Sequence, residues 1–271
     1  MNLILPPNAR LGLVHAERHA NKRDLQHRIE GVCQAISKHG LHINILPRKK
    51  LPPVLNYDLV VAIGGDGTML AAALRCQNTP LLGVRLIPER SIGFLCTVDW
   101  QDFEPCLSAI IHHGAAITAE QRMQCVVDDS PLPQPILNDV LISNACPARA
   151  TRYTLIGPQG EARQCSSGLW VATALGSHAA IRSAGATPLP PGDTRFILKV
   201  RELCAPKHNA ITTMTFFPEQ SPCIVAYDQY CTLFADGALW QRHLTLGSIL
   251  RFQAHPAPLL RVSMPSACTC D

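Results

Sequence analysis

The sequence predicts an α/β N-terminal domain with a Rossmann-like, mostly parallel sheet, followed by an all-β C-terminal domain. Up to residue 98, apolar strand-like runs alternate with helix-like segments, which is typical of a sheet covered by helices on both faces. Beyond that point, short β-like runs separated by Pro, Gly and Asp dominate. We therefore expect an α/β domain at residues 1–98 and a β-rich domain at 99–258, with a last strand near 259–263 that could join either.

Hydrophobic spacing justifies each element of the first domain. Residues 21–38 carry apolar side chains on one face of a helix, and Gly40 stands where a helix commonly ends. A second helix is expected to begin near Thr68. The runs that we expect to form buried strands are 10–15, 42–46, 58–63 and 80–85.

The later part of the chain begins with one helical stretch, 103–112, and continues as strands. Asp236-Gly237, between two apolar runs, is the usual signal of a two-residue hairpin turn, and we interpret it as structural. The expected strands are 123–127, 136–143, 152–156, 168–173, 196–200, 211–217, 224–227, 231–235 and 248–253.

Composition excludes several classes of protein. Only 16% of the 271 residues are charged, and no run approaches the about 18 apolar residues of a membrane helix. The first residues lack the basic and long apolar segments of a signal peptide, so we expect a cytoplasmic protein. The one basic cluster, at 48–50, is interpreted as a solvated loop, so no surface for nucleic acid is expected. The net charge of +4 suits an anionic small-molecule ligand.

The twelve cysteines are not expected to form a disulfide framework. Most stand singly among apolar or small residues, where reduced cysteines act as small hydrophobic side chains. Cys268 and Cys270 form a close pair at the C-terminus, but a Cys-x-Cys pair without partners is a weak metal signal. We therefore assign no zinc site.

The most informative segment is the turn 64–68, Gly-Gly-Asp-Gly-Thr, which directly follows the apolar run 58–63. Glycine leaves no Cβ in the way, and successive amides in such a turn form a concavity that binds anions. The helix expected after the turn directs its positive end to the same place. A carboxylate such as Asp66 repels phosphate unless a metal ion or a reacting hydroxyl lies between them. A tight turn with a capping Asp is the structural alternative, and we favour the phosphate-binding interpretation.

Two other segments carry polar residues in apolar surroundings. Asn138 and Asp139 stand in an apolar strand, where an unpaired carboxylate is costly, so the pair indicates a ligand, a loop hydrogen bond or a bend. In the element 166–185, a strand leads through Leu-Gly-Ser into a run of Ala and Ser, so residues 176–178 are expected at a helix N-terminus open to phosphate or adenine. For His178 the sequence leaves three roles open: a helix N-cap, a hydrogen-bond donor to the ligand, or a surface side chain.

Phe94 follows the fourth expected strand. It is either an aromatic platform near the edge of the sheet or a core residue, and the pattern alone favours neither.

Taken in order, the turn 64–68, Gly-Phe-Leu at 93–95, Asn-Asp at 138–139 and the element 167–185 resemble the NAD kinase family. The resemblance extends over most of the chain, from about residue 10 to residue 263. Within the family the chain is most similar to the plant NADH kinase branch, and the segments that carry this are 90–96, 137–142, 146–148, 165–169 and 179–180.

The resemblance implies a kinase that transfers a phosphoryl group from ATP, or from polyphosphate, to the adenosine-ribose 2′-hydroxyl of NAD or NADH. Asp66 would be the catalytic residue that orients or deprotonates this hydroxyl, and Mg²⁺ or another divalent cation would accompany ATP. The implied substrate-binding residues are Gly64, Gly65, Gly67, Thr68, Phe94, Asn138, Asp139, His178, Ala179 and Ser183. A homodimer or larger assembly is also implied, with neither nucleic acid nor membrane as a partner.

The chain departs from the family pattern around the turn. Ala180 replaces a Tyr, Ser167 replaces an Asp near the nicotinamide side, and Arg85 stands where Gly-x-Asn is usual. We hypothesise that loss of the Asp relaxes the rejection of the uncharged reduced nicotinamide. The alternatives are a lipid kinase of the diacylglycerol kinase type, which does not account for the element 166–185, and a non-catalytic dinucleotide-binding protein, which does not account for Asp66.

Overall fold

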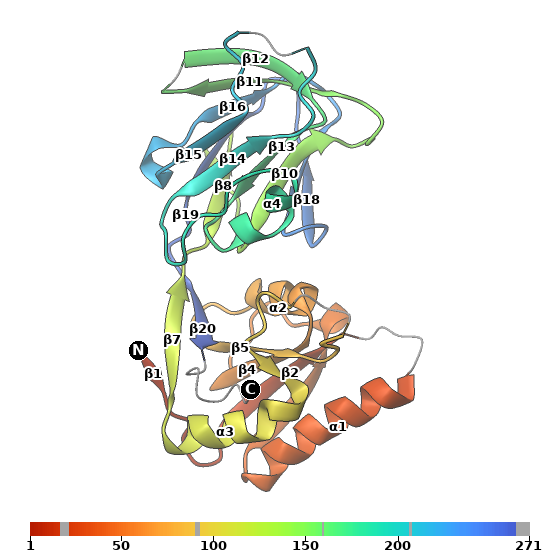
Figure 1. Cartoon of the computed structure of the whole chain (residues 1–271), viewed down its shortest axis with the longest axis vertical. Helices are drawn as coiled ribbons and strands as arrows, with labels where there is room; N and C mark the ends of the chain where they lie inside the picture. Colours follow the sequence, from red (N-terminus) through yellow and green to blue (C-terminus); the bar gives the residue numbers. More distant parts are fainter. Residues whose placement is uncertain (17–21, 90–92, 159, 206–207, 264–271) are drawn as a thin grey trace. The chain divides into compact units, whose positions relative to one another are not determined.

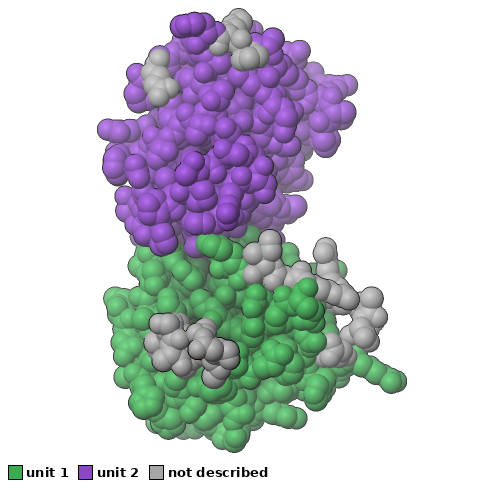
Figure 2. Space-filling view, viewed as in Figure 1, with its two compact units in different colours: residues 1–120, 258–271 green, residues 121–257 purple. Residues whose placement is uncertain are grey.

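The computed structural model of the chain describes residues 1–16, 22–89, 93–158, 160–205 and 208–263. Residue 21 of the first expected helix, residues 90–92 of the segment 90–96, and the pair Cys268 and Cys270 lie outside these ranges. The chain divides into two compact units, Met1–Glu120 with Pro258–Asp271, and Gln121–Ala257 (Figure 2). Among the described residues, no helix combines the length and apolar character needed to cross a membrane.

The first unit is built on a mostly parallel, eight-stranded sheet of order β1-β7-β20-β5-β4-β2-β3, with β6 beside β5 (Figure 1). The parallel strands are β2 (Arg10–His15), β3 (His42–Pro47), β4 (Leu59–Gly64), β5 (Leu81–Arg85) and β6 (Val98–Asp99). The others are β1 (Asn2–Leu3), β7 (Ala115–Glu120) and β20 (Leu259–Ser263), which is parallel to β5 and antiparallel to β7.

Helices cover both faces of this sheet. In Figure 1, α1 (Lys22–Lys38) and α3 (Phe103–His112) lie on one side of it and α2 (Asp66–Ala73) on the other. Successive residues of β5 face opposite sides of the sheet. Leu82 and Val84 face α1 and α3 and join the core formed with these helices. A Cβ on Gly83, which faces the opposite way, would lie 2.8 Å from the Met69 sulfur of α2. The predicted α/β class is therefore confirmed, although α2 begins at Asp66 rather than near Thr68.

The first unit is longer than the expected domain 1–98. Residues of α3 belong to the core of this unit, and β7 pairs with β1 and β20 in its sheet, so the unit ends at Glu120. The sequence of β7, Ala-Ala-Ile-Thr-Ala-Glu, has no strong apolar run and gave no strand signal. The last strand, β20, returns to the first sheet.

The second unit consists of two six-stranded antiparallel sheets that enclose one core, which confirms the predicted all-β class. The first sheet contains, in order, β15 (Thr213–Phe216), β14 (Phe196–Val200), β13 (Leu169–Ala172), β10 (Asp139–Asn144), β17 (Cys231–Ala235) and β18 (Trp240–His243). The second contains β12 (Gly160–Ser166), β11 (Thr151–Gly157), β16 (Cys223–Ala226), β19 (Ile249–Ala254), β8 (Met123–Val127) and β9 (Ser130–Pro131).

Short helices complete the described chain. They are the 3₁₀ helices η1 (Arg48–Lys50), η2 (Trp100–Asp102), η3 (Gly176–His178) and η4 (Pro218–Gln220), and the four-residue α4 (Ala180–Ser183).

Candidate active site

The turn after β4 places Asp66 at the carboxyl edge of the parallel sheet. β4 ends at Gly64, Gly65 is the extended N-cap, and α2 begins at Asp66. The strands β2, β4 and β5 run parallel, so their carboxyl ends share this edge. Open α/β sheets bind ligands at that edge. The expected turn between a strand and a helix is therefore present, in the position where a ligand-binding turn belongs.

The Asp66 carboxylate is held by the loop that follows β5. The Leu95 amide donates a hydrogen bond to Asp66 Oδ1 at 2.8 Å, and the Phe94 amide donates to Oδ2 at 3.2 Å. These bonds fix the direction of the carboxylate and bring the segment 93–95 to the turn. The Phe94 side chain is 46% exposed, so it is not a core residue.

Arg85, one of the departures from the family pattern, is paired with Asp99 beside the same loop. Its Nε donates to Asp99 Oδ1 at 2.6 Å and its Nη2 donates to Oδ2 at 3.0 Å. This hydrogen bonding raises the pKa of Arg85 above its usual value. Burial, with a smaller contribution from the Asp66 charge, raises the pKa of Cys96 to about 12, so its thiol stays neutral. Arg85 is thus a paired cation and Cys96 a neutral thiol, so Asp66 remains the acidic side chain of the turn.

The basic segment 48–50 differs from the expected solvated loop. It forms η1, and Arg48 is half-buried beside α2, while Lys49 and Lys50 are exposed. A Cβ placed on Gly67 would lie 3.2 Å from Arg48 Nη1. The prediction was wrong for Arg48, because the carboxyl end of β3 delivers this residue to the same edge of the sheet as the glycine turn.

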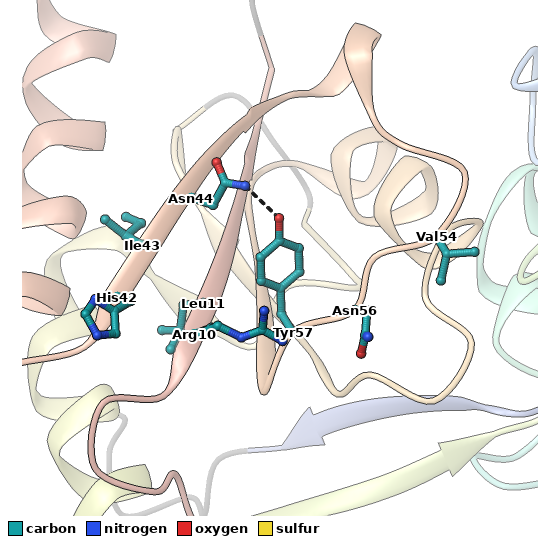
Figure 3. Close-up of a pocket in the computed structure, with 8 residues that line it drawn as sticks. All are labelled: Arg10, Leu11, His42, Ile43, Asn44, Val54, Asn56 and Tyr57. Atoms are coloured by element: carbon teal, nitrogen blue, oxygen red, sulfur yellow. Dashed lines mark hydrogen bonds between the residues drawn. The ribbon is translucent and has the colours of Figure 1, made fainter.

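A pocket in the first unit lies at the other edge of the sheet (Figure 3). Arg10 and His42, which line it, are the first residues of β2 and β3. Across the pocket, the Asn44 side-chain amide donates to the Tyr57 hydroxyl at 2.8 Å. The amino ends of parallel strands are not where such sheets bind ligands, so we do not assign the active site here.

In the second unit, Asn138 and Asp139 are both buried at the start of β10. The Asn138 Oδ1 atom has no hydrogen-bond partner among the residues that the structure describes. Leaving a buried acceptor unsatisfied costs about 1–3 kcal/mol. A ligand that donates a hydrogen bond would remove this cost, so Asn138 has the properties of a ligand-binding residue.

The Asp236 carboxylate organises this segment. It accepts hydrogen bonds from the backbone amides of Leu137 at 3.0 Å, Asn138 at 2.7 Å and Asp139 at 3.3 Å. Asp236 is the first residue of the loop that connects β17 to β18, which confirms the predicted hairpin. The loop between Ala235 and Trp240 has four residues, 236–239, so the expected two-residue turn is wrong. Sequence reasoning missed the second role of this residue, because the turn signal of Asp-Gly explains its presence without any partner.

Burial shifts both carboxyl groups of this cluster. Burial, together with the smaller effect of the neighbouring Asp236 charge, raises the pKa of Asp139 to about 7. Burial also raises the pKa of Asp236 to about 6, although the three backbone N–H groups favour its charged form. Asp236 is therefore the more readily ionised member of the pair.

The turn 173–178 packs directly on Asn138. The Thr173 hydroxyl donates to the Leu137 carbonyl at 2.6 Å, and the Thr173 amide donates to the Asn138 carbonyl at 2.9 Å. A Cβ on Gly176 would lie 1.9 Å from the Asn138 carbonyl oxygen, so only glycine fits there. The structure thus brings together the two polar segments of this unit that the sequence singled out separately.

The element 166–185 does not contain the expected open helix N-terminus. η3 is one 3₁₀ turn, and α4 has only four residues. The amides of 176–179 donate to acceptors inside the segment, namely Thr173 Oγ1 and the carbonyls of Thr173, Ala174, Leu175 and Gly176. The expectation of a second phosphate-binding N-terminus is wrong, because these N–H groups are already used.

The remaining predicted residues of this unit lie on η3 and α4. His178 is half-buried within η3, and its Nε2 atom lies 3.2 Å from the Leu189 carbonyl oxygen. Ala179 joins η3 to α4, and Ser183 is exposed on the last turn of α4. Asp66 and Phe94 belong to the first unit.

Comparison with known proteins agrees with this architecture. Residues 15–115 match the family described as ATP-NAD kinase N-terminal domain. The chain is 30% identical over 265 residues to an NADH kinase of Arabidopsis thaliana, covering 85% of this chain and 80% of that protein. It is 29% identical over 237 residues to a probable NADH kinase of Oryza sativa subsp. japonica, with 79% and 73% covered.

Two solved structures share the fold. An NAD kinase from Archaeoglobus fulgidus in complex with ATP superposes with a TM-score of 0.73 at 20% identity, covering 93% of this chain and 92% of that one. Yeast NADH kinase complexed with NADH gives a TM-score of 0.77 at 16% identity, covering 97% and 86%.

The glycine turn with its acid lies at the carboxyl edge of the parallel sheet, and the match to NADH kinases over most of the chain places the protein among the kinases. The match to the Arabidopsis protein extends over most of both chains. The chain belongs to the NAD kinase family.

Proposed function

We propose that this protein is an NAD(H) kinase that transfers the γ-phosphoryl group of ATP to the adenosine-ribose 2′-hydroxyl of NAD or NADH, giving NADP or NADPH. The observation that carries the proposal is the Asp66 carboxylate, fixed by two amide hydrogen bonds at the glycine turn of an NAD kinase family member. Phosphoryl transfer requires positioning and charge stabilisation more than covalent chemistry, and such a turn supplies both.

Asp66 is the proposed catalytic residue. Its carboxylate takes the proton of the 2′-hydroxyl, and the ribose oxygen forms the new bond to the γ-phosphorus. The bond from this phosphorus to the oxygen that it shares with the β-phosphorus breaks, and ADP leaves with the electron pair. The proposed phosphate-binding residues are those of the turn around Asp66: Gly64, Gly65, Gly67 and Thr68.

The second unit is the proposed NAD(H)-binding unit. Asn138 and Asp139 would bind the adenine and the ribose, and the unpartnered Asn138 Oδ1 supports this because the adenine amino group is a hydrogen-bond donor. His178, Ala179 and Ser183 are proposed to line the adenine pocket. In the first unit, Phe94 offers an exposed ring on which a base can stack.

The proposed donor is ATP with a divalent cation, in the first place MgATP. Mg²⁺ is commonly held by one or two carboxylates together with substrate phosphates. The single carboxylate of the turn suits a cation that arrives bound to the nucleotide. From family membership we also propose a homodimer or larger assembly, and from composition a cytoplasmic location.

Incubation of the full chain with MgATP and either NAD or NADH tests the function, with NADP(H) formation as the readout. Formation of NADP(H) supports the proposal. Parallel incubation with polyphosphate identifies the donor, and incubation with diacylglycerol tests a lipid kinase. Binding of NADH without turnover would instead identify a non-catalytic dinucleotide-binding protein.

A further inference from the structure

We propose that Arg48 is a further residue of the phosphoryl-transfer site and that its guanidinium group contacts the terminal phosphates of the nucleoside triphosphate. The inference rests on the proposed function, which does not itself include this residue. Arg48 belongs to the basic segment 48–50, for which the sequence alone predicts a solvated loop.

The position of Arg48 is the first argument. The guanidinium group lies over Gly67 in the first turn of α2, where a Cβ would be 3.2 Å from Nη1. Such a distance is shorter than the about 3.5–4.0 Å of an optimal contact between heavy atoms. The glycine at this place in the turn therefore makes room for the arginine as well as for a ligand.

The backbone around Gly67 is the second argument. The amides of Thr68 and Met69 donate to the Gly65 carbonyl at 2.8 Å and 3.2 Å, so the hydrogen bonds of α2 begin there. The amides of Asp66 and Gly67 precede these bonds, and the helix has no acceptor to offer them. Arg48 thus adds a formal positive charge beside N–H groups that already favour an anion.

The charge of the site is the third argument. Asp66 repels a triphosphate, and a positive side chain beside the turn would reduce this repulsion in addition to the divalent cation that accompanies ATP. Arg85 lies near the same turn, but it forms a two-point ion pair with Asp99 at 2.6 Å and 3.0 Å. The planar guanidinium of Arg48 can bind two phosphate oxygens at once, a geometry that lysine cannot reproduce.

Arg48 would act when the γ-phosphoryl group passes from ADP to the ribose oxygen, as negative charge spreads over its three equatorial oxygens. Arginine residues that stabilise this charge in other phosphoryl-transfer enzymes contribute about 10³–10⁵-fold to kcat. The alternative is that Arg48 only packs against α2. A packing role affects Tm and the KM of both substrates alike, whereas a phosphate contact lowers kcat and the affinity for ATP and leaves Tm and the KM for NADH unchanged.

The test compares R48M and R48K with K50M, a matched control on the same 3₁₀ turn with an exposed side chain. For each variant we would measure kcat and KM for MgATP and for NADH, the Kd values of ATP and ADP, and Tm. The two Kd values separate the contact to the γ-phosphate from the rest of the nucleotide.

We expect R48M to lower kcat/KM for MgATP by about 100-fold or more and to abolish the preference for ATP over ADP. The KM for NADH and Tm should stay near their wild-type values. R48K should recover part of the loss, and K50M should behave as the wild type does.

Two results would overturn the inference. The first is that R48M and K50M have equal kinetics. The second is that R48M raises the KM for MgATP and the KM for NADH by similar factors and also lowers Tm. If the wild type forms no NADP(H), the proposed function fails. The Kd values of ATP and ADP for R48M then still decide whether Arg48 contacts the terminal phosphate.

Discussion

The Asp236 carboxylate accepts a 2.7 Å hydrogen bond from the Asn138 amide, which lies 98 residues away in sequence. The bond joins the tip of a hairpin to the segment that enters β10. Since the amides of Leu137 and Asp139 donate to the same carboxylate, one side chain holds the backbone of the proposed adenine-binding segment.

Replacing Asp236 is expected to weaken NAD(H) binding selectively. D236A leaves buried amides without an acceptor, at a cost of about 1–3 kcal/mol in the free energy of unfolding. The KM for NADH should rise, while the KM for ATP should change little. D236N keeps the shape of the side chain and is the variant to use if D236A does not fold.

The exposed acid Asp129 provides the control. D129N should match the wild type in urea denaturation and in both KM values. An unchanged KM for NADH in folded D236N would contradict the assigned role.

Gly176 offers a test by size alone. G176A would place a methyl group 1.9 Å from the Asn138 carbonyl oxygen, so we expect a loss of about 1–3 kcal/mol and weaker NADH binding. In G31A the nearest atom, on Trp100, is 4.0 Å away, and the substitution lies within a helix. It should raise stability by about 0.5–1 kcal/mol. Equal thermal shifts in the two variants would argue against the packing described here.

The proposed general base can be tested by D66N. In the wild type the Phe94 and Leu95 amides donate to different oxygens, and D66N replaces one of these oxygens by an NH2 group that cannot accept. The amide also cannot take a proton from the hydroxyl, so kcat/KM should fall by about 100-fold or more. D58N is a matched control, because Asp58 also accepts a backbone N–H bond, from Arg10 at 2.7 Å, but at the amino edge of the sheet. Near-normal turnover by D66N would exclude the role.

The buried carboxyl pair makes stability depend on pH. The pKa of Asp139 is raised to about 7, above its value in the unfolded chain, so the folded state binds this proton more tightly. The contribution is fully present below the unfolded pKa of about 3.9 and is lost as pH rises through the folded value. Urea midpoints should therefore fall as the pH rises from about 4 to about 8, and D139N should remove part of the fall. A D139N profile identical to that of the wild type would contradict this account.

A substitution at Ser167 tests the preference between NAD and NADH. S167D restores an acid near the proposed nicotinamide side and should shift the ratio of kcat/KM values toward NAD by about 5-fold, the effect of a charge interaction of about 1 kcal/mol. The two substrates serve as controls for each other. A strong preference of the wild type for NAD would refute the hypothesis.

Elements with local signals were predictable from the sequence. The strand 196–200 and the helix 103–112 coincide with β14 and α3, because apolar spacing determines both. β12 escaped prediction because its inward side chains are Ala162, Gln164 and Ser166, which carry little hydrophobic signal. The roles of Arg48 and Asp236 also escaped it, since both depend on which distant elements become neighbours in the sheets.

The pairing of Leu259 with Glu120 makes the second unit an insertion between β7 and β20. β20 lies between β7 and β5, and Arg261 donates to Glu120 at 2.8 Å across this pair. During synthesis, every residue of the second unit therefore leaves the ribosome before β20 is available to complete the first sheet. The unit that begins the chain therefore acquires its last strand only after the whole second unit has been synthesised.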